Sequence, residues 1–102
     1  MSKQKQYKYS TTWTSRFKRD YKKAMSRGLD ISLIDEVIVL IAEGTNQQRL
    51  IEEYDDHELK GNWKGYRECH ILPDWLLIYK LDEDVLILSL TRTGSHSDLL
   101  GI

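Results

Sequence analysis

The chain has 102 residues, of which 40% are hydrophobic and 30% are charged, and its net charge at pH 7 is −1. This length predicts one domain, residues 1–102, because a chain of this size builds a single core. The one cysteine, Cys69, excludes an intrachain disulfide, and the most apolar run, residues 31–42, is too short to cross a bilayer. The N-terminus is polar and basic and has no apolar signal core. We therefore expect a soluble cytoplasmic domain with no membrane contact.

Positive charge is concentrated at the N-terminal end of the chain. Residues 1–27 carry nine Lys or Arg and one acid, Asp20, which gives +8 and leaves −9 on the remaining residues. Such a division of charge favours a polyanionic partner that is bound by one face, and nucleic acid fits this description. A basic helix that is only solvated is the alternative.

A short strand near residues 6–10 and a first helix are predicted at the start of the chain. Residues 10–12 carry hydroxyl groups that can cap this helix, and Gly28 can end it. Lys18 and Arg19 fall on its solvent side. The apolar stripe of the helix recurs at helical spacing and consists of Trp13, Phe17, Tyr21 and Ala24.

A second helix is predicted to begin after Asp30, which can cap it, and to end at Gly44. Aliphatic residues between positions 33 and 41 give it a broad apolar face, so we expect it to be well buried. Residues 46–62 are polar, and for them we expect a loop with a brief extended piece.

Three strands are predicted near residues 63–71, 75–81 and 85–92, where the side-chain pattern has a period of two. Their connections are short, so the neighbours must be antiparallel, and the only proline suits the first turn. Ser95 and Asp98 then resemble a capping box over one helical turn. The predicted order is β-α-α-β-β-β, an α+β fold in which two N-terminal helices pack on an antiparallel sheet.

Side chains with catalytic potential lie along the first strand of this sheet and at its turn. Glu68 and His70 share one face of the strand, whereas Arg67 and Cys69 lie on the other. We expect Arg67 to pair with a neighbouring carboxylate or to pack its stem. Asp74 lies just past the turn and can lean toward His70.

The same end of the sheet collects residues from the rest of the chain. Arg92 ends the last strand and His96 follows it, and His57 precedes the sheet and can fold over the same surface. Imidazoles suit the two proton transfers of metal-free RNA cleavage, one from the 2′-hydroxyl and one to the leaving 5′-oxygen. Arg92 could bind phosphate, and Trp75 could stack on a base.

Each of these residues also has an ordinary structural explanation. A strand histidine is often structural, Asp74 follows a proline in common turn chemistry, and Trp75 could belong to the core. A metal site is the competing chemistry, but paired cysteines and an HExxH-like spacing are missing from the sequence. Cys69 and His70 point to opposite faces of a strand. We therefore expect neither a metal nor another cofactor.

The C-terminal half of the sequence carries a longer and more specific pattern. The stretch "DHELKGNWKGYRECHILPDWLLIYK", followed by "RTGSHSDLLG", resembles the YafQ branch of the RelE/ParE toxin superfamily. These proteins are small bacterial toxins of type II toxin–antitoxin systems. The resemblance covers residues 55–101 closely, and the first half agrees in its layout of a short strand and two helices.

This resemblance implies a metal-independent endoribonuclease that cuts mRNA in the ribosomal A site and is neutralised by a cognate antitoxin. Its partners would be the antitoxin, mRNA and rRNA, with the basic first helix, including Lys18 and Arg19, facing ribosomal phosphates. Arg92 matches a position used for activity or RNA contact, and Leu100 stands where a related group often has an aromatic. The catalytic positions of the family fall on His57, Glu68, His70, Asp74 and His96.

Within this set, the resemblance favours His70 and His96 as the two proton-transfer residues, with Asp74 orienting His70. Two other functions remain open on the same fold. One is a ParE-like toxin that inhibits a protein such as DNA gyrase by binding, and the other is a degenerate toxin that survives as an antitoxin-bound co-repressor. The three histidines and Asp74 favour the nuclease, because a binding module does not need them.

Overall fold

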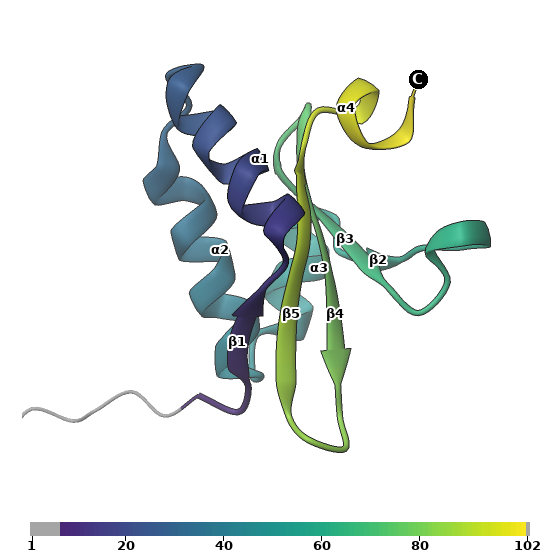
Figure 1. Cartoon of the computed structure of the whole chain (residues 1–102). Coiled ribbons are helices and arrows are strands. Elements are labelled where there is room, and N and C mark those ends of the chain that lie inside the picture. Colours follow the sequence, from purple (N-terminus) through teal and green to yellow (C-terminus); the bar gives the residue numbers. More distant parts are fainter. Residues whose placement is uncertain (1–6, 102) are drawn as a thin grey trace, which may run out of the picture.

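The computed structural model describes residues 7–101, and it has the α+β fold expected from the sequence (Figure 1). Five strands form one sheet in the order β1-β5-β4-β3-β2. The helical elements are α1 (Ser15–Ser26), α2 (Ile31–Glu43), α3 (Gln47–Tyr54), a 3₁₀ helix (Gly61–Trp63) and α4 (His96–Leu100). The strands are β1 (Ser10–Trp13), β2 (His57–Glu58), β3 (Arg67–Leu72), β4 (Trp75–Asp82) and β5 (Ile87–Gly94).

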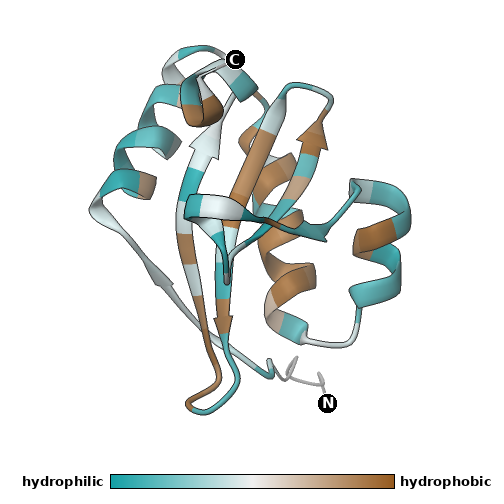
Figure 2. Cartoon of the chain, turned by 90° about the vertical axis from the view of Figure 1, so that its right-hand side faces the viewer, coloured by the Kyte–Doolittle hydropathy of each residue, from teal (hydrophilic) through white to brown (hydrophobic). Residues whose placement is uncertain are grey.

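The central strand β4 is buried on both of its faces. One face of β4 packs into the main core through Trp75, Leu77 and Tyr79, which contact residues of α1, α2 and α3. Helices α1 and α2 cover this side of the sheet (Figure 1). Leu76 and Ile78 point the other way, toward a smaller apolar cluster that includes residues of α4. Figure 2 views the molecule from this second side and shows apolar residues along the central strands. Burial on both faces explains why the sequence of β4 is a continuous apolar run and does not alternate between apolar and polar residues.

The start of the chain differs from the prediction. The first strand spans Ser10–Trp13, whereas residues 6–10 were predicted, and residue 6 lies outside the described residues. Thr14 caps α1 by accepting a hydrogen bond from the Phe17 backbone N–H at 3.0 Å. Trp13 belongs to β1, where its side chain is 53% exposed, and not to the helix. The reason is that residues 10–13 pair in parallel with residues 87–90 of β5, a distant partner that helical spacing does not reveal.

The middle of the chain contains one confirmed and one wrong prediction. Asp30 caps α2, and Gly44 ends it in the left-handed region at a φ of 76°. The expected loop of residues 46–62 instead contains α3, which buries only Leu50 and so has no apolar stripe long enough to detect, whereas the expected brief extended piece is present as β2. Strand β3 starts at Arg67, later than the predicted residue 63, because the 3₁₀ helix occupies residues 61–63.

The C-terminal strands and turns follow the prediction closely. The β3–β4 and β4–β5 pairs are antiparallel, and the chain turns at residues 73–74, between the paired Leu72 and Trp75. A bulge in β5 at Thr91 places Arg92 opposite Ile78. The expected capping box of α4 is present. Within the described part of the chain, no helix is long and apolar enough to cross a membrane.

Candidate active site

Three imidazoles lie together on the sheet face that α1 and α2 leave uncovered. His57 comes from β2, His70 from β3 and His96 from the first residue of α4. The ring centroid of His70 lies 6.1 Å from that of His57 and 5.6 Å from that of His96. We refer to these three residues as the histidine cluster. Three segments that are far apart in sequence thus bring their imidazoles within reach of one substrate.

Glu68 contacts two members of the histidine cluster. Its Oε1 lies 3.6 Å from His57 Nε2 and 3.9 Å from His70 Nε2, and the residue is only 4% exposed. Glu68 Oε2 and His70 Nδ1 are buried and have no hydrogen-bond partner among the described residues. Buried polar atoms are rarely left in this state, so both are suited to accept or donate a hydrogen bond when substrate is present.

Asp55 contacts two members of the histidine cluster, although the sequence interpretation did not include it. Its backbone carbonyl lies 2.7 Å from His57 Nδ1, and its carboxylate lies 3.6 Å from His70 Nδ1. Because a carbonyl oxygen can only accept a hydrogen bond, His57 Nδ1 is the donor in this contact, and the contact turns Nε2 of the same ring toward Glu68. Asp55 ends α3 in the left-handed region, at a φ of 51°, and this conformation turns the chain into β2.

Asp74 contacts His96 and not His70, which corrects the expectation that it orients His70. Its Oδ1 accepts a hydrogen bond from the His96 backbone N–H at 2.9 Å and lies 2.7 Å from His96 Nδ1. The backbone hydrogen bond, followed by the imidazole contact, lowers the pKa of Asp74 from its ordinary value. The reason for this pairing is the first N–H of α4, which has no partner inside the helix and lies beside the β3–β4 turn.

Arg92 and Trp75 were predicted to contact RNA, and the structure gives them different surroundings. Two N–H groups of Arg92 donate to Asp20, both at 3.0 Å, and Asp20 also accepts the Thr93 backbone N–H at 3.2 Å. Trp75 is 2% exposed, lies in the main core and donates to Thr93 Oγ1 at 3.0 Å. Base stacking by Trp75 is therefore wrong, because both faces of its indole are covered.

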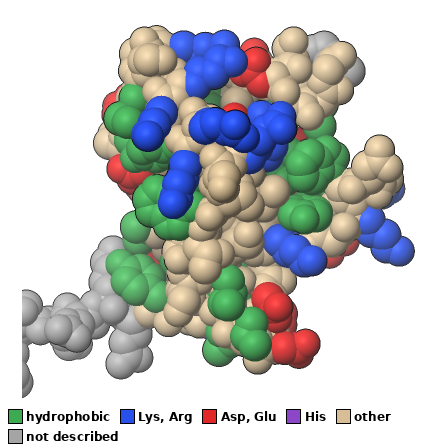
Figure 3. Space-filling view, in the orientation of Figure 1, with side chains coloured by type: hydrophobic (Ala, Val, Ile, Leu, Met, Phe, Trp, Pro, Cys, Tyr) green, Lys and Arg blue, Asp and Glu red, His purple; other side chains and the backbone are tan. Residues whose placement is uncertain are grey.

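A basic groove lies between α1 and the end of β5. It has a volume of about 460 Å³ and is lined by four cations, Arg16, Lys23, Arg27 and Arg92, and by three acids, Asp20, Asp74 and Asp98. Figure 3 shows Lys and Arg side chains gathered over the surface where α1 lies. Lys18 and Arg19 are exposed on the same helix but do not line the groove. Because Asp74 both lines the groove and contacts His96, the groove adjoins the histidine cluster.

One acid of the groove takes part in the capping of α4. Asp98 accepts a hydrogen bond from the Ser95 backbone N–H at 3.1 Å and pairs with Arg27, also at 3.1 Å. The Ser95 backbone N–H, followed by the Ser95 hydroxyl and Arg27, lowers the pKa of Asp98 to about 2. Arg27 therefore connects α1 to the helix that carries His96.

The sequence interpretation did not include Asp20 and Asp55 in this site, although the sequence contains an indication of the role of Asp20. Asp20 is the only acid among the first 27 residues, and a lone acid in a basic helix indicates a specific cation partner, here Arg92. For Asp55 the sequence contains no such indication, because its contacts depend on the unexpected helix α3. No group of three or more His, Cys, Asp or Glu side chains in residues 7–101 could hold a metal ion.

The fold and the sequence match one class of bacterial protein. Residues 9–101 match the family model described as the bacterial toxin of type II toxin–antitoxin system, YafQ. The crystal structure of YafQ from E. coli strain BL21(DE3) aligns with a TM-score of 0.82 at 35% identity and covers 91% of this chain and 99% of that one. The E. coli DinJ–YafQ toxin–antitoxin complex aligns with a TM-score of 0.80 at 36% identity, over 92% and 99% of the two chains.

A curated relative agrees with this match. The mRNA interferase toxin YafQ of E. coli K12 is 37% identical over 89 residues, which cover 87% of this chain and 92% of that protein. The chain therefore belongs to the YafQ family of toxins of type II toxin–antitoxin systems.

Proposed function

We propose that this toxin is an endoribonuclease that cleaves mRNA on the ribosome by metal-independent acid/base catalysis, and that a cognate antitoxin neutralises it. The YafQ of E. coli K12 is named an mRNA interferase toxin, and a YafQ of E. coli is also described in a toxin–antitoxin complex with DinJ. The observation that carries the proposal is the histidine cluster, in which the ring of each histidine lies within 3.6 Å of a carboxylate oxygen. Action on translated mRNA would place the toxin in the cytoplasm.

The proposed reaction is a transesterification within the RNA strand. The 2′-oxygen attacks the phosphorus, the new 2′-O–P bond forms, and the P–O5′ bond breaks. A base takes the proton of the 2′-hydroxyl, and an acid gives a proton to the leaving 5′-oxygen. The products are a 2′,3′-cyclic phosphate and a free 5′-hydroxyl, so this step uses no water as a reactant.

We assign the base to His96 and the acid to His70. Asp74 holds Nδ1 of His96 at 2.7 Å, which leaves Nε2 of that ring free to accept a proton. His70 lies between two carboxylates, with Glu68 at 3.9 Å and Asp55 at 3.6 Å, and these contacts can hold its ring in place while it gives a proton to the leaving oxygen. His57, on the far side of His70, adds positive charge near the phosphate when it is protonated.

The basic groove is the proposed path of the RNA backbone away from the cleaved bond. Phosphates would contact Arg16 and Lys23, and also Arg92 through the N–H groups that Asp20 does not use. Lys18 and Arg19, on the exposed side of α1, are placed to contact rRNA. Binding through several phosphates predicts an affinity that falls steeply with salt.

The test is cleavage of a defined mRNA by purified protein on translating ribosomes, with mapping of new 5′ ends. We expect cuts that persist in EDTA, that are lost without ribosomes, and that fall by about 10²–10⁴-fold in His70→Ala and in His96→Ala. Gln48→Ala, an exposed change on α3, is the control and should cut normally. Cleavage at the wild-type rate by both histidine variants would overturn the assignment. Inhibition of gyrase without any cleavage would support the ParE-like alternative.

A further inference from the structure

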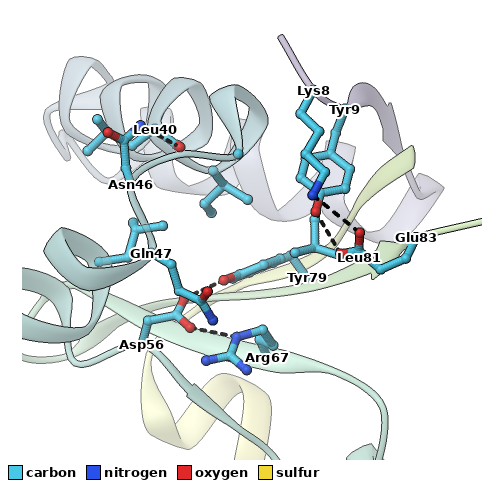
Figure 4. A pocket seen from close by; sticks show the side chains of 13 residues that line it. Lys8, Tyr9, Leu40, Asn46, Gln47, Asp56, Arg67, Tyr79, Leu81 and Glu83 are labelled. Carbon is cyan, nitrogen blue, oxygen red and sulfur yellow. Dashed lines mark hydrogen bonds and ion pairs between the residues drawn. The ribbon is translucent and has the colours of Figure 1, made fainter. Parts of the chain in front are cut away.

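A buried polar network lies on the sheet face opposite the histidine cluster. Asp56 is 4% exposed, its Oδ1 accepts a hydrogen bond from Arg67 Nε at 2.7 Å, and its Oδ2 accepts one from the Tyr79 hydroxyl (Figure 4). Both carboxylate oxygens therefore have partners. We refer to these three residues as the Asp56 network.

The charges of the Asp56 network depend on one another. Burial, followed by the charge of Asp56, raises the pKa of Tyr79 far above its usual range, so its hydroxyl remains a donor. Burial alone would lower the pKa of Arg67, but the hydrogen bond and charge of Asp56 raise it. Asp56 is thus a buried carboxylate that is stable only while both partners stay in place.

The network lies next to two active-site residues along the chain. Asp56 precedes His57, and Arg67 precedes Glu68. In the register of β2 and β3, His57 is opposite Glu68. Successive side chains in a strand point to opposite faces. When Asp56 contacts Arg67 on the helix side, the next residue of each segment, His57 and Glu68, must therefore meet on the face of the histidine cluster.

The strand β2 needs this support because it has only two residues, His57 and Glu58. A shift of one residue would turn His57 toward the helices and away from the histidine cluster. So short a ladder gives little resistance to such a shift, whereas a buried carboxylate with two partners resists it. The backbone N–H groups of Asp55 and Asp56 also donate to the Leu50 carbonyl, which joins β2 to α3.

We propose that Asp56, with Arg67 and Tyr79, is a positioning residue of the active site. It acts through the sheet, without touching RNA, and sets the side of β2 on which His57 lies and the distance of His57 from Glu68. The activity part of this proposal rests on the proposed nuclease function, but the placement of His57 can be measured without any RNA.

The structure supplies a matched pair of tyrosines for the test. The hydroxyls of Tyr79 and Tyr9 line the same cavity of about 160 Å³, and their side chains are 2% and 5% exposed (Figure 4). Tyr79 donates to Asp56, whereas Tyr9 donates to Glu83, in the turn between β4 and β5, at 2.6 Å. Replacing either residue with phenylalanine removes one buried hydroxyl, but only Tyr79→Phe removes a partner of Asp56.

We expect Tyr79→Phe to lower kcat about tenfold with KM changed less than about twofold, since a small displacement of a catalytic group affects the chemical step more than binding. Tyr9→Phe should leave both constants unchanged. In NMR spectra without RNA, the His57 imidazole signals should shift in Tyr79→Phe and not in Tyr9→Phe. Equal effects of the two substitutions on kcat and on these signals would overturn the proposal.

Asp56→Asn is the second variant. Its kcat, measured per folded molecule, should fall at least as far as that of Tyr79→Phe.

Failure of the positioning proposal can be distinguished from failure of the nuclease assignment. If the wild-type protein cuts mRNA but the His57 signals are unchanged in Tyr79→Phe and Asp56→Asn, the positioning role is wrong. If the wild-type protein does not cut while these signals shift, the positioning role stands and the nuclease assignment is wrong.

Discussion

Two aspartates with hydrogen-bonded partners, Asp74 in the β3–β4 turn and Asp56 just before β2, have opposite surroundings. Asp74 has an exposed side chain and contacts His96, whereas Asp56 is buried and contacts Arg67 and Tyr79. Removing an exposed contact costs little stability because water replaces it, while removing a buried one leaves a charge without a partner. The comparison teaches that loss of activity at this site can arise in two ways, from missing chemistry at Asp74 or from a displaced strand at Asp56.

The largest expected effect on stability is that of Asp56→Asn. It removes the buried carboxylate that pairs with the partly buried Arg67 and accepts from Tyr79, so the free energy of unfolding should fall by about 3–5 kcal/mol. Asp55→Asn is the matched neighbour, with a side chain that is 79% exposed and a left-handed backbone that Asn tolerates. In urea unfolding, this control should lose less than about 1 kcal/mol of its free energy of unfolding. Equal losses in both variants would erase the proposed difference between buried and exposed aspartates.

Asp74→Asn should have the reverse effect, with a change in activity and almost none in stability. Loss of the carboxylate beside His96 is expected to lower kcat on the order of tenfold to a hundredfold, while the stability of the fold stays almost unchanged because the carboxylate is exposed. Asp82→Asn is the control, because Asp82 accepts the backbone N–H of Asp84 at the other hairpin turn. Wild-type cleavage by Asp74→Asn would mean that His96 needs no carboxylate.

A smaller effect is expected from the pH dependence of Asp98. Its folded-state pKa of about 2 lies below the ordinary 3.8, so the ionised group stabilises the protein above the unfolded-state pKa. This contribution, no more than about 1 kcal/mol for a solvent-accessible carboxylate, is lost as the pH falls through about 2. The Tm difference between wild type and Asp98→Asn should therefore be constant above about pH 5 and shrink toward pH 2. A difference independent of pH would exclude the capping carboxylate as its source.

The sequence predicted those parts of the fold that depend on local patterns. The alternation that places Glu68 and His70 on one face, the turn at Pro73 and the capping box of Ser95 are all confirmed. Arg67 also pairs with a carboxylate, as expected. Each of these features depends on residues that are neighbours in the chain or on the two-residue period of a strand.

The features that the sequence did not predict depend on distant contacts. The parallel pairing of β1 with β5 joins residues 10–13 to residues 87–90, and α3 buries a single residue, Leu50. Asp74 could lean toward either of two imidazoles, and only the position of α4 selects His96. For Trp75 the sequence offered both a core position and a stacking platform, and the core position is the one observed.

The most direct test of the account is the pH dependence of single-turnover cleavage on the ribosome, with EDTA present and chemistry rate-limiting. If His96 takes one proton while His70 gives another, the rate should rise and then fall between about pH 5 and 8. His70→Ala should lose the arm of this curve that belongs to the acid. A flat rate over the same range in the wild-type protein would contradict proton transfer by the histidine cluster.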